Sequence, residues 1–308
     1  MCGVDSSPMP SSRDVTRATA LIVLSSCSFG SLTTLTVFVR ESGLSILPAM
    51  LWRYLLAAVV LATIVRRSAI TSIGSKQALR LLLIGGCGQA VITYVSLLAL
   101  DYLPVGALAF LFYTYPAWVA VMAAITGRDA LTATRLIALV VAMSGIAVMI
   151  GAPSAASLNT TGVLIALGSA ILFALYLPAL NEAQRGIPPL VSTFYLVTGV
   201  SLSFLLAGVF TRTVDVPPSL SSWALVAGLA LVSTVIAFVS LIAGLRILGP
   251  LRTSIIGTTE PFFTAVLGIV LLRERPTLAT FVGGAMIAGA VLLLQWKTST
   301  QAEVESAS

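Results

Sequence analysis

The chain of 308 residues contains no histidine, and only 9% of its residues are charged. An ordinary soluble domain carries roughly 25% charged residues, so a soluble fold could not hide this much apolar surface. Without histidine, the chain lacks the commonest proton shuttle and the commonest metal ligand. The three cysteines do not have the spacing of metal ligands, and Cys27 and Cys87 lie inside apolar runs. We therefore expect no metal site, no disulfide framework and no cofactor.

Long apolar runs dominate the chain instead, and 58% of its residues are hydrophobic. A helix needs about 20 apolar residues to cross roughly 30 Å of hydrocarbon. These runs predict an all-α integral membrane protein with ten transmembrane helices, at residues 18–39, 46–65, 81–100, 105–126, 136–150, 161–180, 190–210, 223–245, 251–272 and 278–296. We expect residues 1–17 to be a disordered tail, residues 297–308 to be a C-terminal tail, and the first helix to be an uncleaved span.

The basic residues predict the orientation of these helices. With a cytoplasmic N-terminus, the cytoplasmic side receives twelve Lys and Arg residues, and the outer side receives four, which are Arg40, Arg212, Arg273 and Arg275. Cytoplasmic loops carry an excess of Lys and Arg, so this asymmetry predicts a multi-pass protein of the cell membrane with both termini in the cytoplasm. The same asymmetry accounts for the net charge of +6, and we expect no nucleic-acid partner.

The two halves of the chain are similar to each other at a shift of 145 residues. Three segments match without a gap: Ala99–Leu103 with Gly244–Leu248, Thr114–Pro116 with Thr259–Pro261, and Gly127–Asp129 with Leu272–Glu274. We expect one five-helix repeat at residues 18–150 and a second at 161–296. Because five is an odd number, the second repeat must be inverted relative to the first. Inverted repeats are a common basis for alternating access in transporters.

Several segments resemble a known family: Phe29-Gly30, Phe173–Tyr176, Leu98–Pro104, Leu245–Pro250, Glu260-Pro261 and Leu271–Glu274. From about Ala18 to Trp296, the chain resembles the EamA family of the drug/metabolite transporter superfamily. Members of that family often have Trp in place of Phe29 and Phe173, and Gly in place of Arg273. The resemblance implies a ten-helix carrier that exports amino acids or other small metabolites, commonly driven by an ion gradient.

Two ionisable residues, Arg53 and Glu260, lie inside the expected spans. A charge in hydrocarbon is costly, so each is a functional candidate. Their expected depths differ by only about 5 Å, and a long arginine side chain could bridge them. The functional hypothesis is that Glu260 exchanges a proton for substrate. Two alternatives stay open: both residues merely hold helices together, or Arg53 extends outward to the interface.

Pro116 and Pro261 occupy the same position in the two repeats. Each removes the hydrogen bond to the carbonyl group four residues earlier, on Phe112 and Gly257, which predicts kinked, cavity-lining helices.

Polar and aromatic residues in the spans complete the set of binding candidates. Thr253, Gly257, Glu260 and Thr264 have the spacing of one helix face, which predicts a polar lining. The other candidates for binding substrate or ion are Gln89, Tyr94, Tyr113, Tyr115 and Tyr176, and core packing is the alternative for each aromatic residue. Gly85-Gly86 and Gly283-Gly284 are expected to permit close helix packing.

Together these features predict a secondary active transporter that exports amino acids or related small polar metabolites by alternating access, coupled to protons. The chain has no phosphate-binding loop, so direct ATP drive is not expected. A carrier of other metabolites or drugs stays open, although polyanionic sugar-type substrates would favour more than one intramembrane cation. A channel or an intramembrane enzyme is the alternative from another class, but the spans lack a Ser/Lys or paired-Asp arrangement. The expected partners are substrate, lipid and protons, and a homodimer is left open.

Overall fold

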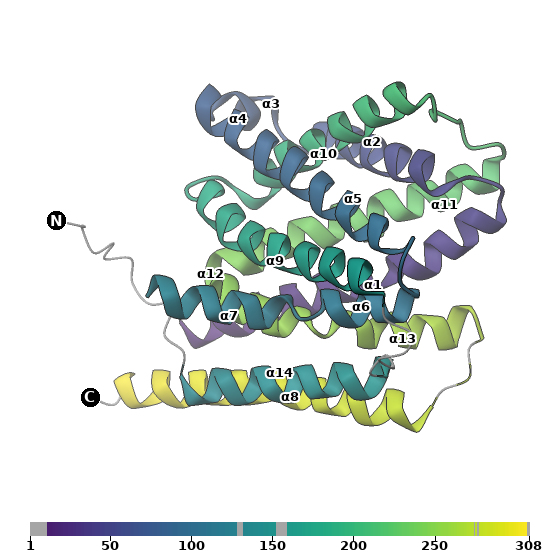
Figure 1. The fold of residues 1–308 in the computed structure, drawn as a ribbon. Helices are drawn as coiled ribbons and strands as arrows, with labels where there is room; N and C mark the ends of the chain where they lie inside the picture. The colour runs from purple at the N-terminus through teal and green to yellow at the C-terminus, as the bar shows by residue number, and fades with distance from the viewer. Residues whose placement is uncertain (1–10, 128–131, 152–158, 274, 276, 307–308) are drawn as a thin grey trace.

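The structure is a computed structural model that describes residues 11–127, 132–151, 159–273, 275 and 277–306 (Figure 1). The described residues form helices joined by turns, and no strand occurs among them. The helices are α1 (Ser12–Glu41), α2 (Ile46–Ile64), α3 (Arg67–Thr71), α4 (Ser75–Leu83), α5 (Gln89–Ala99), α6 (Val105–Phe112), α7 (Tyr115–Thr126), α8 (Ala133–Ile150), α9 (Thr160–Ala183), α10 (Pro189–Thr211), α11 (Leu220–Ala230), α12 (Ala237–Gly257), α13 (Glu260–Leu271) and α14 (Leu278–Ser306). Two π-helical segments, η1 (Ile84–Gly88) and η3 (Leu231–Ile236), join α4 to α5 and α11 to α12.

Eight helical stretches of the described residues are long and apolar enough to cross a membrane, and two shorter apolar helices follow them. This confirms the prediction of an all-α, multi-pass membrane protein. One of the eight, Leu220–Gly257, has 38 residues, about 57 Å of helix, which is too long for one crossing. It is broken at Gly249, where φ is 73° and ψ is 171°. Division at Gly249, with residues 250–257 joined to the shorter helix Glu260–Leu271 that follows, yields ten apolar segments. The number of crossings stays a prediction.

The first helix begins at Ser12, six residues before the expected start at Ala18. A capping box explains the difference: Ser11 Oγ accepts a hydrogen bond from the Asp14 amide, and the Asp14 carboxylate accepts one from the Ser11 amide. The third span also begins earlier than expected, at Ser75. Lys76 and Arg80 lie in its first turns, and because they are charged, the expected apolar window started only at residue 81. At the other end of the chain, α14 continues past Trp296 to Ser306, so most of the expected C-terminal tail is helical.

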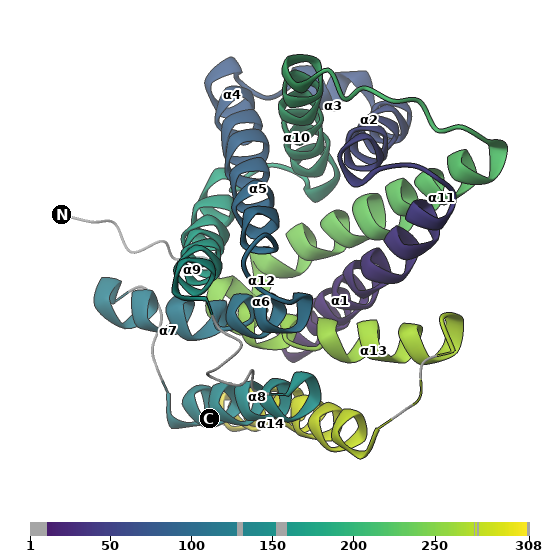
Figure 2. The ribbon, with the colours of Figure 1, turned by 45° about the vertical axis from the view of Figure 1, so that its right-hand side comes forward.

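The repeat is visible in the irregular parts of the helices. In the first half, α6 ends at Phe112 and α7 begins at Tyr115, and in the second half α12 ends at Gly257 and α13 begins at Glu260. From these two breaks, α7 and α13 extend toward opposite ends of the bundle (Figures 1 and 2). Among the described residues, each half also contains one π-helical segment, η1 or η3. These features are the ones that two inverted copies of one five-helix unit would share.

Glycine lets helix backbones approach closely at the contact between α8 and α14, which lie side by side at one edge of the bundle (Figures 1 and 2). A Cβ atom on Gly283 would overlap the carbonyl oxygen of Gly145 and would lie 2.7 Å from the Cβ of Met149. A Cβ on Gly86 of η1 would likewise lie 2.5 Å from the carbonyl oxygen of Gly199 on α10. These glycines therefore pack helices together, as the sequence predicted for the glycine pairs.

The start of α1 and the end of α14 lie at the same end of the bundle (Figure 1). This placement is the one that an even number of crossings requires.

The substitution Gly283→Ala is expected to lower the free energy of unfolding by about 1–3 kcal/mol, because the added methyl group forces α8 and α14 apart. Gly289→Ala on the same helix meets no atom within 4 Å, so it is expected to leave stability unchanged or to raise it by up to about 1 kcal/mol. Thermal unfolding of the purified variants in detergent measures both. Equal melting temperatures for the two variants would contradict close packing at Gly283.

Candidate functional site

Glu260 is the first residue of α13, directly after the break in the ninth apolar segment. Its side chain is partly exposed, and its carboxylate lies next to the hydroxyl group of Tyr113. A helix N-terminus carries a partial positive charge, so this position favours a carboxylate electrostatically. The hydroxyl of Thr264, one turn later, donates to the backbone oxygen of Glu260 at 3.1 Å. The break thus places a partly exposed carboxylate at the start of a half-helix.

Tyr115 occupies the equivalent position of the first repeat, 145 residues before Glu260. In the structure the two residues also lie near each other. Its hydroxyl donates to the backbone oxygen of Ser254 at 3.3 Å. A Cβ on Gly257 would lie 2.7 Å from that hydroxyl, so the glycine makes room for the phenol. The Glu260 carboxylate also lies near both Tyr113 and Tyr115. The two helix breaks, which are 145 residues apart in sequence, therefore meet in space.

Five aromatic residues surround this meeting point, and we call them the aromatic cluster: Phe112, Tyr113, Tyr115, Phe173 and Tyr176. Phe173 of α9 lies at the centre, with its ring centroid 4.7 Å from that of Tyr115 in an edge-to-face arrangement and 5.5 Å from that of Phe112. Tyr176 lies 5.9 Å from Phe173. Among the described residues, the buried hydroxyl of Tyr176 has no hydrogen-bond partner. An unsatisfied buried hydroxyl is costly, so a polar partner at this position would stabilise the protein.

Arg53 is only 2% exposed, and it binds the second π-helical segment. Its Nε donates to Thr234 Oγ1 and its Nη2 donates to the backbone oxygen of Ser233, both at 2.6 Å. Its guanidinium also lies 4.9 Å from the centroid of the Tyr54 ring. Within the described part of the chain, Arg53 makes no ion pair with Glu260, and it does not extend outward to the interface. The structure therefore places Arg53 as a tie between α2 and η3.

Three predicted candidates make no hydrogen bond to Glu260 within the described residues. Tyr94 is 68% exposed on an apolar helix surface. Gln89 bonds within its own helix, its Nε2 donating to Thr93 Oγ1 at 3.5 Å. Thr253 is buried, and its hydroxyl has no partner in the part of the chain that the structure describes; it lies one residue before the carbonyl that accepts from Tyr115. The predicted polar face from Thr253 to Thr264 is not continuous, because the helix stops after Gly257 and restarts at Glu260.

Both prolines lie in the first turn of a new helix, so the structure has breaks where the sequence predicted kinks. Proline is favoured at the first positions of a helix, because its missing N–H group would have no partner there. Backbone hydrogen bonds between residues three apart tighten the turns between the half-helices. The Thr114 amide donates to the Leu111 carbonyl oxygen, and the Thr259 amide donates to the Ile256 carbonyl oxygen. Breaks of this kind leave backbone carbonyl groups available inside the protein.

Ser233 and Thr234 are the partners of Arg53, and sequence reasoning did not identify them. Their signal was present, because they form a polar pair inside a strongly apolar span. Ser233 also bonds to α1, its Oγ lying 2.8 Å from Ser31 Oγ.

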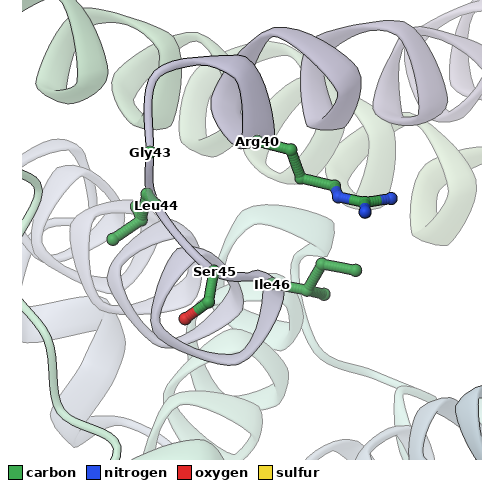
Figure 3. A pocket seen from close by; sticks show the side chains of 5 residues that line it. All are labelled: Arg40, Gly43, Leu44, Ser45 and Ile46. Atoms are coloured by element: carbon green, nitrogen blue, oxygen red, sulfur yellow. The ribbon is translucent and has the colours of Figure 1, made fainter.

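A separate hollow of about 420 Å³ lies at the turn between α1 and α2 (Figure 3), lined by Arg40, Gly43, Leu44, Ser45 and Ile46. None of these residues belongs to the set around Glu260.

Comparison with known proteins decides the family. The model of the family described as EamA-like transporter family matches residues 16–151 and 160–296. The chain belongs to the EamA-like transporter family. An uncharacterized transporter of Archaeoglobus fulgidus is 28% identical over 206 residues, which cover 66% of this chain and 71% of that protein. A solved crystal structure superposes with a TM-score of 0.73 at 18% identity, covering 91% of this chain and 96% of the other, so the two share a fold. This EamA-like protein is a membrane transporter.

The bond between Arg53 and Thr234 is expected to contribute about 1–3 kcal/mol to stability, because one partner is charged. We expect Arg53→Lys and Thr234→Val each to lower the melting temperature in detergent, since lysine lacks the planar fork that reaches both acceptors. In the double variant the two losses should not add. Additive losses would show that the two side chains are independent.

Proposed function

We propose that this EamA-like protein is a proton-coupled secondary active transporter of the cell membrane, with both termini in the cytoplasm. It exports amino acids or related small polar metabolites by alternating access. Glu260 is the residue that exchanges a proton for substrate. Tyr113, Tyr115 and Tyr176 line the substrate site with Gly257 and Thr264.

The observation that carries this proposal is the partly exposed carboxylate at the meeting point of two broken helices. A carboxylate in the membrane interior is rarely tolerated without a function, and proton relays are one of the functions that use it. Within the described residues no lysine or arginine forms an ion pair with Glu260, so its charge is left to be balanced by a proton or a cationic group. Discontinuous helices near the midplane form the substrate and ion sites of many secondary transporters.

The pairing of the two breaks supports alternating access. Tyr115 and Glu260 belong to different repeats, yet the hydroxyl of Tyr115 bonds to the segment that precedes Glu260. A rocking movement of one repeat against the other would change the surroundings of both residues at once. Four candidates are not included among the substrate contacts. Gln89 bonds within its own helix and Arg53 bonds to η3. Tyr94 lies on the outer surface of the bundle, and Thr253 is buried in the packed interior.

Flux measurements in proteoliposomes test the proposal. A panel of radiolabelled metabolites is supplied with an imposed pH gradient, and uptake and counterflow are followed for the unmodified protein and for Glu260→Gln. We expect saturable, gradient-driven flux of at least one compound, and at least a tenfold loss of gradient-driven flux in the variant, which corresponds to about 1.4 kcal/mol. Exchange of substrate for substrate should persist in the variant more than net flux does.

Glu182→Gln is the matched control, because Glu182 is an exposed carboxylate that pairs with Arg185 at 3.3 Å near the end of α9. It is expected to transport like the unmodified protein. Proton dependence that survives in Glu260→Gln would remove Glu260 from the coupling step, and flux that does not saturate would indicate a channel.

A further inference from the structure

The segment between the second and the third apolar segments is strongly basic. Residues 65–80 contain no acidic residue and four cations, which we call the basic patch: Arg66, Arg67, Lys76 and Arg80. All four side chains are exposed. Among the described residues, Arg66, Lys76 and Arg80 form no ion pair with a carboxylate. The segment therefore presents a concentration of positive charge that none of its own side chains offsets.

Hydrogen bonds hold this segment against the second repeat. The hydroxyl of Tyr195 on α10 donates to the backbone oxygen of Ile70 at 3.0 Å. The Nε2 atom of Gln77 on α4 donates to the backbone oxygen of Arg185 at 3.1 Å. Ile70 and Ile73 also pack against the hydrophobic core at this end of the bundle. Because the backbone of α3 and α4 is fixed in this way, a ligand of the basic patch does not have to order the segment when it binds.

The outer face of α4 combines charge with apolar surface. Lys76, Arg80 and Leu83 are four and three residues apart, so they lie on one face of the helix, and Leu79 lies beside them. Leu79 is 55% exposed and Leu83 is 52% exposed. The face begins with a cation and ends with a leucine about 10 Å further along the helix axis. A phospholipid has the same profile, with a charged headgroup at one end and apolar chains below it.

We propose that the basic patch binds the headgroup of an anionic phospholipid, whose acyl chains lie along Leu79 and Leu83 of α4. A phosphodiester accepts charge-assisted hydrogen bonds from lysine and arginine side chains. Clusters of four or more basic residues next to a transmembrane helix attract anionic headgroups, and each cation adds to the attraction. A zwitterionic lipid carries the same phosphate together with a cation of its own, which the patch repels. The inference concerns the membrane around the protein and does not depend on which substrate the protein carries.

Lipid titration of the purified protein in detergent tests the proposal. Phosphatidylglycerol and phosphatidylcholine with identical acyl chains are added in turn, and native mass spectrometry gives a dissociation constant for the first bound lipid of each kind. We expect phosphatidylglycerol to bind about tenfold more tightly than phosphatidylcholine, because several cations face one headgroup. Salt at about 0.5 M is expected to reduce this preference, since the cations are exposed and are screened.

Two double variants separate the headgroup from the acyl chains. Lys76→Gln/Arg80→Gln is expected to reduce the preference for phosphatidylglycerol to about twofold, because two of the four cations are lost. Leu79→Ala/Leu83→Ala keeps every charge and removes apolar surface, so both lipids should bind about threefold more weakly while the preference stays near tenfold.

Arg13→Gln/Arg17→Gln is the matched control. It also removes two exposed cations from the first turns of a helix, and the start of α1 lies away from α3 and α4 in both views (Figures 1 and 2). This variant should keep the preference of the unmodified protein.

Three results would overturn the inference. Equal binding of the two lipids by the unmodified protein would show that the patch does not select charge. An equal loss of preference in the control would show that net charge alone attracts the lipid. Displacement of bound phosphatidylglycerol by an excess of glycerol 3-phosphate would show that the patch takes a soluble phosphate and not a lipid.

Discussion

In hydrocarbon, every backbone polar group has to find its hydrogen-bond partner inside the protein, and the site of this transporter depends on where the chain departs from that rule. The two departures that matter are the breaks after Phe112 and Gly257. A proline lies within the first two residues of the helix that follows each break. Its missing N–H group therefore falls at a position where a helix amide has no partner within the helix. The two breaks lie against each other, and the ring of Phe173 on α9 packs against Phe112 and Tyr115 at the first of them.

The same rule explains why Arg53 is tolerated. A π-helical segment widens the helix by one residue and shifts the backbone bonds, which presents the Ser233 oxygen sideways. The guanidinium binds this oxygen and the Thr234 hydroxyl, and Thr234 in turn bonds to the Leu229 oxygen. In the other repeat the equivalent contact, between α10 and η1, is made by Gly86 and Gly199 without a charge. One pseudo-symmetric pair of helices is thus joined by a buried cation and the other by close backbone contact.

The fold was largely predictable from sequence, because apolar runs, basic residues and the repeat each act over many residues. The site was predictable in part: Glu260 and the prolines were identified from charge and from the repeat, and Tyr115 is the repeat partner of Glu260. The partner of Arg53 was not predictable, because depth in the bilayer does not say which helix a side chain faces. The break after Gly257 was predicted as a kink, since sequence gives the position of a proline and not the path of the chain before it. Tyr94 and Tyr113 look alike in sequence, yet one is 68% exposed and the other is buried at 9%.

The inverted repeat places two residues at one position in the molecule, and only one of them, Glu260, carries a charge. If Tyr115 were also a carboxylate, two like charges would share a poorly solvated space, and one would have to bind a proton. A phenol at that position avoids the repulsion and still provides a hydroxyl, which fixes the segment before Glu260 through Ser254. The repeats therefore have different tasks at the same position: the second supplies the charge and the first supplies its surroundings. In the proposed function, a single carboxylate held among aromatic rings binds either one proton or one cationic group, and that exclusivity would couple the movement of one to the movement of the other.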